Sequence, residues 1–296
     1  MPKFAEQQSM ENPSAIALTD PEKSLTWEQV NEVLNRAANL LLNIDIGPKR
    51  RVAVFAENAS ETALAHLGAL FGGSSSVPVN FHLTAEETSY ILQDSESQIL
   101  FVDNHTAERG ILAAQEAGID TIIGWKCEDY DQITSWEDWI GTGSPVSSPD
   151  EVTPLPNLLY TSGTTGLPKG TELPPTMFAG GSTMTEHIEG LSKSGFAEFG
   201  THLVVGPMYH TGPLSGMRLL TLGIPSVILG RFDAEATLAA IDNHKTESAV
   251  MVPTHFVRML ALPDEIKEKY NVSSMQFAAH TGAKCPVDVM RSMIEW

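Results

Sequence analysis

The residues with the clearest chemical potential form one short stretch, Tyr160–Gly170, which reads YTSGTTGLPKG. It contains three glycines, four small hydroxyl residues and a single lysine, Lys169. Glycines let the backbone approach an anion closely and adopt positive φ angles. Hydroxyl and main-chain N–H groups donate hydrogen bonds, and a lysine adds a mobile positive charge. This composition predicts a loop that binds phosphate groups.

The stretch differs from the phosphate loop of the P-loop NTPases. That motif carries a Gly-Lys-Ser or Gly-Lys-Thr run, whereas here Pro168 precedes Lys169 and Gly170 follows it. Pro168 also disfavours helix at Leu167, so the loop cannot pass its phosphate to a helix that begins at the lysine. The alternative interpretation is a surface turn rich in glycine and hydroxyl residues, with an ordinary surface lysine.

The elements that must position this loop alternate between short apolar strands and helices. In the first half, strands are predicted at 51–55, 98–103 and 121–123, and capping boxes starting at Asn58 and Thr84 predict two helix starts. Such alternation is typical of parallel strands joined by crossover helices. The sequence therefore predicts an α/β fold with two successive β/α layers and mostly parallel sheets.

The alternation of strands and helices continues after a segment rich in glycine, serine and proline at 141–156, which has the composition of a linker. This predicts a first α/β subdomain over 1–150 and a second, carrying the loop, over 151–296. Strands are predicted at 158–161, 202–205, 226–229, 248–252 and 275–279, and helices at 175–191, 233–244, 254–262 and 286–296.

Composition narrows the classes of function. Acidic residues outnumber basic residues 37 to 18, for a net charge of −19, which argues against a nucleic-acid partner because such proteins need a basic surface. Two cysteines, Cys127 and Cys285, cannot form a disulfide framework and lack the spacing of metal ligands, so no metal-binding residue is assigned. The polar start and the absence of a long apolar run lead us to expect a cytoplasmic protein without a transmembrane segment.

The stretch Tyr160–Gly170 resembles the signature loop of the adenylate-forming superfamily, which includes acyl-CoA synthetases, fatty-acid and aryl-CoA ligases, luciferases and the adenylation domains of peptide synthetases. Further segments resemble landmarks of this family in the same order. They are Leu25–Val30, Ser75–Asn80 with His82–Thr84 and Glu87, Pro207–Gly212, Arg231–Asp233, Val252–Thr254 and Ala279–Pro286. The resemblance covers nearly the whole chain.

The resemblance implies roles for individual residues. The loop would wrap the phosphates of ATP and then the departing pyrophosphate through Thr161, Ser162, Gly163, Thr164, Thr165, Gly166 and Lys169. His210 matches a position beside the acyl site that orients the carboxylate, so that Lys169 and His210 are the catalytic candidates. Thr281, Gly282 and Ala283 match a turn that borders the adenine and the acyl group. The alternatives are a structural histidine at 210 and a simple strand-to-helix turn at 281–283.

The implied reaction joins a small carboxylic acid to ATP, giving acyl-AMP and pyrophosphate, and then transfers the acyl group to coenzyme A, with Mg²⁺ neutralising the phosphates. An acyl acceptor on a carrier protein, luciferase-like oxidation, or a non-catalytic nucleotide-binding fragment are the alternatives. Later motifs of the family do not occur before Trp296. We therefore expect a truncated N-terminal domain without the C-terminal lid domain, inactive alone, from a family whose members include homodimers.

Overall fold

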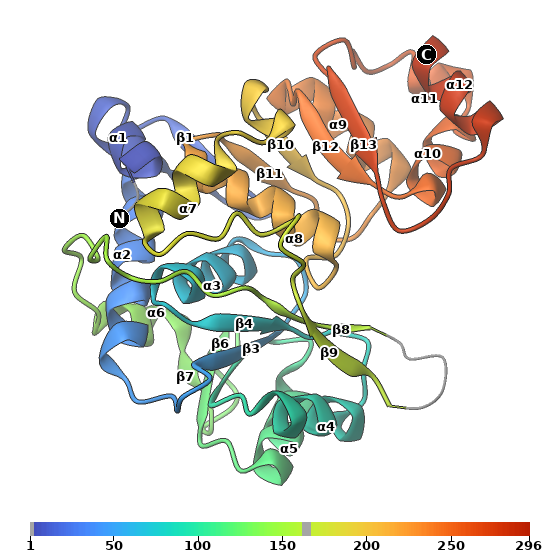
Figure 1. The fold of residues 1–296 in the computed structure, drawn as a ribbon. Coiled ribbons are helices and arrows are strands. Elements are labelled where there is room, and N and C mark those ends of the chain that lie inside the picture. The colour runs from blue at the N-terminus through green and yellow to red at the C-terminus, as the bar shows by residue number, and fades with distance from the viewer. Residues whose placement is uncertain (1–2, 162–166) are drawn as a thin grey trace.

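The computed structural model describes residues 3–161 and 167–296, which form two main sheets and a separate two-stranded hairpin (Figure 1). The first sheet is parallel throughout and has the order β4-β3-β5-β6-β7. Its strands are β3 (Arg51–Phe55), β4 (Ser75–Pro78), β5 (Ile99–Asp103), β6 (Thr121–Trp125) and β7 (Thr134–Ser135). The three central strands are buried along nearly their whole length, as expected for a parallel sheet covered on both faces.

The second sheet has the order β13-β12-β10-β11-β1-β2 and is parallel except for the pairing of β2 with β1. Its strands are β1 (Ile16–Thr19), β2 (Ser24–Thr26), β10 (His202–Val204), β11 (Ser226–Ile228), β12 (Ser248–Met251) and β13 (Phe277–His280). Two strands from the start of the chain thus belong to the sheet of the second half, with Leu18 opposite Ser226. The expected division into 1–150 and 151–296 remains a prediction, and these two strands cross it.

The third element is an antiparallel hairpin of β8 (Leu158–Thr161) and β9 (Lys169–Glu172). It lies beside β4, where the Ser75 hydroxyl donates a hydrogen bond of 2.6 Å to the carbonyl oxygen of Pro156. The position of β8 agrees with the sequence prediction. Its pairing is antiparallel because β9 follows it after a short connection, which leaves no room for a crossover helix.

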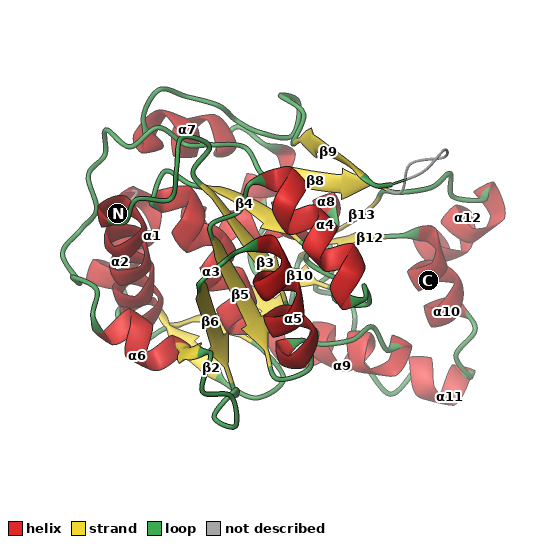
Figure 2. Cartoon of the chain, turned by 90° about the horizontal axis from the view of Figure 1, so that it is seen from below, coloured by secondary structure: helices red, strands yellow, loops and turns green. Residues whose placement is uncertain are grey.

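The helices cover both sheets and fill the space between them. They are α1 (Lys3–Glu11), α2 (Trp27–Asn43), α3 (Ser60–Phe71), α4 (Ala85–Ser95), α5 (Ala107–Ala117), α6 (Trp136–Gly141), α7 (Met184–Leu191), α8 (Thr211–Met217), α9 (Ala234–His244), α10 (Pro253–Leu260), α11 (Asp264–Lys267) and α12 (Val287–Glu295), with 3₁₀ turns η1 (Gly195–Glu198) and η2 (Arg218–Leu222). Helices α4 and α5 lie on one face of the first sheet, and α3 lies on the other (Figures 1 and 2). Within the described ranges, no helix is long and apolar enough to cross a membrane.

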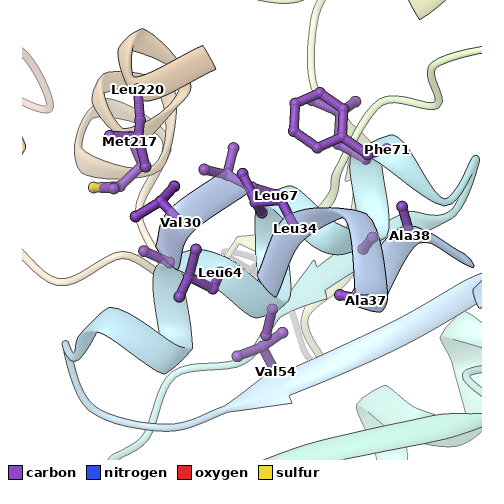
Figure 3. Packing of buried hydrophobic residues seen from close by; sticks show 14 of the residues in the cluster. Val30, Leu34, Ala37, Ala38, Val54, Leu64, Leu67, Phe71, Met217 and Leu220 are labelled. Carbon is purple, nitrogen blue, oxygen red and sulfur yellow. The ribbon is translucent and has the colours of Figure 1, made fainter. Parts of the chain in front are cut away.

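The largest core cluster lies between the two sheets. Val30 of α2 and Leu64 of α3 pack with Met217 of α8 and Leu220 of η2, and all four are at most 2% exposed (Figure 3). Burying a side chain of this size contributes about 1.5–3 kcal/mol. Because the same cluster also contains Val204 of the second sheet, the two halves share one core.

The expected capping boxes have different outcomes. At Thr84 the prediction is confirmed, since its hydroxyl accepts from the Glu87 N–H at 3.2 Å and the Glu87 carboxylate accepts from the Thr84 N–H at 2.9 Å. The box at Asn58 is wrong. Helix α3 begins at Ser60 after Ala59, and the Ser60 N–H donates at 2.9 Å to the carboxylate of Asp20 instead. A distant side chain therefore replaces the local cap.

The helix predicted at 175–191 is correct only in its second part. Helix α7 begins at Met184, and the residues before it form turns. Gly180 and Gly181 adopt φ angles of +71° and +104°, which a right-handed helix excludes. Helix α8 was not predicted at all, because its seven residues include Gly212, Pro213 and Gly216.

Candidate functional site

The hairpin holds the predicted phosphate loop at its end. Thr161 and Lys169 are directly opposed across the two strands, and both are exposed. The remaining predicted phosphate-binding residues lie outside the described residues: Ser162, Gly163, Thr164, Thr165 and Gly166. The ammonium group of Lys169 forms no hydrogen bond or ion pair with any described residue, which leaves its charge available for an anion.

Helix α4 anchors both strands of the hairpin close to the loop. The Tyr160 hydroxyl donates a hydrogen bond of 2.5 Å to the Asp94 carboxylate, and the Tyr90 hydroxyl donates one of 3.1 Å to the Pro168 carbonyl. Burial, together with the bond to Asp94, raises the pKa of Tyr160 above its ordinary value, so its hydroxyl keeps its proton. The two ends of the loop are thus held by one helix.

His210 lies at the start of α8, after the turn that follows β10. Its N–H donates to the Pro207 carbonyl at 3.0 Å, and its ring lies 4.4 Å from the ring of Tyr209. Tyr209 in turn meets Phe81 edge-on at 5.2 Å. The His210 side chain is exposed, yet partial desolvation lowers the pKa of its imidazole below the ordinary value. The side chain is therefore neutral at pH 7 and can accept or donate a hydrogen bond.

A hollow of about 390 Å³ brings His210 together with two other predicted residues. It is lined by Gly206, Pro207, His210, Thr211, Gly212, Pro213, Val250, Met251, Val252, His255, Thr281 and Gly282. These residues lie at or just after the carboxyl ends of β10, β12 and β13, the edge at which open α/β sheets bind ligands. Ala283, the third residue predicted on this turn, does not line the hollow.

Two glycines shape the wall of this hollow. The N–H of Thr281 donates to the Met251 carbonyl at 3.0 Å, and Gly282 then turns the chain with a φ of +81°. On the opposite side, a Cβ placed on Gly212 would lie 2.9 Å from both Thr281 Cγ2 and Val250 Cγ1. Helix α8 can therefore approach the end of β13 only because residue 212 has no side chain.

His255 also lines the hollow, although the sequence analysis assigned it no role. Its ring stacks on Phe232 at 4.1 Å, and its Nδ1 accepts a hydrogen bond of 3.4 Å from the Val252 N–H. Desolvation and the nearby charge of Arg258 lower the pKa of His255 to about 4. The wall of the hollow thus combines the two imidazoles of His210 and His255 with Thr211, Thr281, glycine backbone and apolar side chains of valine, methionine and proline. Its signal in the sequence was its place directly after the matched segment Val252–Thr254.

A second hollow, of about 470 Å³, lies on the other side of α8 and is mainly apolar. Phe178, Phe196 and Leu219 contribute to its wall. It shares Gly212, Val250 and Thr281 with the first hollow, so the two cavities meet at α8.

The segment before His210 is fixed by Asn58, the residue that the sequence analysis misassigned to a helix cap. Asn58 is 8% exposed and makes three hydrogen bonds with residues of the second sheet's loops. Sequence alone could not reveal these partners, which lie about 150 residues or more away along the chain.

Metal ligands are not gathered at this site. Across residues 3–161 and 167–296, no group of three or more histidine, cysteine or acidic side chains is placed to hold a metal ion. The described residues therefore do not by themselves provide a site for Mg²⁺.

Comparison with known proteins agrees with the α/β fold described above. The family described as AMP-binding enzyme matches residues 5–296. Indoleacetate–CoA ligase of Aromatoleum aromaticum is 29% identical over 261 residues, which are 85% of this chain and 49% of that protein. Fatty acid–[acyl-carrier-protein] ligase ScoC of Streptomyces coeruleorubidus is also 29% identical, over 85% of this chain and 47% of its own length. The chain thus spans about half the length of these relatives.

Solved structures agree in fold. The inhibitor-bound N-terminal domain of FACL13 from Mycobacterium tuberculosis superposes with a TM-score of 0.77 at 23% identity, covering 99% of this chain and 72% of that one. The anthranilate CoA ligase AuaEII in complex with anthranoyl-AMP gives a TM-score of 0.79 at 20% identity, covering 99% and 57%. The expected mixed α/β architecture of an adenylate-forming N-terminal domain is confirmed.

Proposed function

Because the chain belongs to the family of AMP-binding enzymes, we propose that it is the N-terminal part of an ATP-dependent carboxylate–CoA ligase. The observation that carries this proposal is the hollow at the strand ends, which gathers His210, Thr281 and Gly282 from segments distant in sequence. The relatives that match 85% of the chain support it, since their names describe ligases of a carboxylic acid with coenzyme A or with a carrier protein.

In the proposed first step, a carboxylate oxygen of the acid attacks the α-phosphorus of ATP. The bond between the α-phosphorus and the bridging oxygen breaks, and pyrophosphate leaves as acyl-AMP forms. Lys169 and the loop of the hairpin hold the departing pyrophosphate, because a positive charge beside a leaving group stabilises the charge that develops there. His210 orients the carboxylate, and Thr281 and Gly282 border the adenosine. In the second step a thiol gives up its proton and its sulfur attacks the acyl carbon; the bond from that carbon to the phosphate oxygen breaks, and AMP leaves.

ATP and coenzyme A enter this scheme as substrates. The acid occupies the apolar hollow behind α8, which opens beside the residues that border the nucleotide. Mg²⁺ has no step here, since the described residues supply no cluster of carboxylates for it.

A second acceptor for the acyl group is favoured by a specific observation. ScoC is named as a ligase of an acyl-carrier protein, and tyrocidine synthase 3 of Brevibacillus parabrevis is 34% identical over 57% of this chain and 2% of its own length. A panel of thiol acceptors added to preformed acyl-adenylate distinguishes a free coenzyme A thiol from a carrier-protein thiol.

The change Lys169→Ala tests the proposed function. Carboxylate-dependent exchange of pyrophosphate with ATP, measured in the full-length protein, should fall roughly 100-fold because a charge at the leaving group is lost. The stabilisation of the 296-residue chain by AMP, measured as a shift in Tm, should be unchanged, since Lys169 serves pyrophosphate and not AMP.

Lys49→Ala is the matched control, because Lys49 is exposed and pairs with Glu96 at 2.5 Å in the first half. Pyrophosphate exchange as fast in Lys169→Ala as in Lys49→Ala would contradict the assigned role. A chain whose Tm responds to neither ATP nor AMP would favour a fragment that does not bind nucleotide.

A further inference from the structure

Asn58 occupies an unusual place between the two sheets. It lies three residues after β3 of the first sheet and two residues before the start of α3, yet its side chain forms three hydrogen bonds with loops of the second sheet. Its amide nitrogen donates to the carbonyl oxygens of Gly206 at 2.9 Å and Leu229 at 3.1 Å. Its amide oxygen accepts from the Met208 N–H at 2.8 Å.

These bonds enclose the turn that leads to His210. Gly206 and Met208 flank Pro207, and the Pro207 carbonyl accepts the N–H of His210 at 3.0 Å. Leu229, the third partner, directly follows β11, the strand that neighbours β10. One buried side chain thus fixes the backbone on both sides of the residue to which His210 is bonded.

We propose that Asn58 is a positioning residue, whose side-chain amide fixes the turn 206–208 and thereby sets the place of His210 in the hollow. The first hollow is lined by Gly206 and Pro207 as well as His210, so a displacement of this turn changes both its wall and its histidine. Because Asn58 follows a strand of the first sheet, it ties the position of His210 to that sheet.

Only an amide meets all three partners. Two carbonyl oxygens require donors, and one N–H requires an acceptor, a set that asparagine supplies from a single planar group. Aspartate has the same shape but would present an oxygen to both carbonyls. Alanine would leave the three buried backbone groups without partners, each at a cost of about 1–3 kcal/mol.

The test compares Asn58→Asp and Asn58→Ala with Asn39→Asp in the 296-residue chain. Asn39 is the matched control, because its amide also donates to two carbonyls, those of Ser144 at 2.9 Å and Val146 at 2.8 Å, but away from the site. The readout is the ring resonance of His210 in a ¹H–¹³C correlation spectrum, assigned with His210→Gln. Thermal unfolding of each variant is recorded in parallel.

We expect the His210 ring resonance to move in both Asn58 variants and to stay in place in Asn39→Asp, even where all three lower Tm. An unmoved resonance in a folded Asn58 variant would reduce Asn58 to a purely structural role and overturn the proposal. If neither Asn58 variant folds, the proposal is tested on the wild-type chain. Slow exchange of the Asn58 side-chain amide protons, with nuclear Overhauser effects to the Met208 N–H, supports the proposal, and exchange as fast as that of a free amide overturns it.

The catalytic consequence rests on the proposed function. In the full-length protein, Asn58→Ala should slow pyrophosphate exchange roughly 10- to 100-fold, as expected for a misplaced group near the reacting atoms, while Asn39→Asp exchanges normally. Exchange at the wild-type rate in Asn58→Ala would count against the positioning role. Absence of exchange in the wild type would instead defeat the proposed function, and the His210 resonance would still decide the role of Asn58.

Discussion

At position 212 the first hollow, which contains His210, depends on the absence of a side chain. Gly212 lies in the first turn of α8, and the two methyl groups that it faces belong to Thr281 and Val250, on the end of β13 and on β12. The same three residues line both the first hollow and the second. A single carbon atom added here changes both cavities.

We expect Gly212→Ala to weaken the binding of AMP to the chain and to lower the free energy of unfolding by about 1–3 kcal/mol, because the added methyl group overpacks the wall. Gly141→Ala is the control, since Gly141 also lies in a helix but has nothing within 4 Å of an added Cβ. It should raise stability by about 0.5–1 kcal/mol. Titration calorimetry with AMP and urea unfolding measure both effects, and equal AMP affinity in the two variants would contradict the argument.

The site residues divide according to how their roles arise. His210, Thr281 and Gly282 were predicted from the resemblance of short segments to the adenylate-forming family, and the structure brings them to one hollow. His255 and Asn58 were missed or misassigned because their roles depend on contacts made by the folded chain. Residues proposed to contact the ligands were therefore easier to predict from the sequence than residues that hold them in place.

Among the elements, the hairpin β8–β9 must be held in a fixed position for the proposed chemistry, because it carries the predicted phosphate loop. Its two strands are joined to α4 by the hydroxyls of Tyr160 and Tyr90, on either side of the loop. Because β9 is exposed along its whole length, few apolar contacts hold it in place. These two hydrogen bonds therefore fix the base of the loop.

Tyr160→Phe should accelerate hydrogen exchange of the β9 amides, since the bond from the hydroxyl to Asp94 is lost while the ring remains. Tyr270→Phe is the matched control, because it removes a 2.8 Å hydrogen bond from a half-buried tyrosine to the carboxylate of Glu235 in the other half of the chain. Exchange measured by mass spectrometry should change at β9 only in Tyr160→Phe. Unchanged exchange at β9 would mean that pairing with β8 alone holds the strand.

Elements with a buried apolar pattern were the predictable ones. Strands β3 and β8 were placed at their observed bounds, and α9 and α10 within two residues, because burial imposes a clear periodicity. Strand β9 reads Lys-Gly-Thr-Glu and has no such pattern, and α8 is rich in glycine. Both are held by pairing or packing with other elements, which no local propensity encodes.

On the scale of the whole molecule, histidines buried in both halves link stability to pH. His66, His187, His202 and His255 are each at most 8% exposed. Burial lowers the pKa of His66 to about 3 and those of the other three to about 4, from an ordinary value of 6.5. The unfolded chain therefore binds more protons than the folded chain between about pH 6.5 and 4.

The free energy of unfolding should accordingly fall as the pH falls from 6.5 towards 4, by about 1.4 kcal/mol per pH unit for each such histidine. In His202→Gln this slope should be smaller by the contribution of one histidine, whereas His244→Gln, which changes an exposed histidine, should keep the full slope. Urea unfolding at several pH values measures this slope. Equal slopes in the two variants would show that folding does not lower the pKa of His202.

The pairing of β1 with β11 also affects how the chain folds during its synthesis. Strand β1 leaves the exit tunnel about 200 residues before its parallel neighbour β11. At synthesis rates of 5–20 residues per second, β1 remains without that partner for roughly 10–40 s. During this interval β1 can pair only with β2, so the edge that later meets β11 stays open, with the apolar Ala17 and Leu18 beside it.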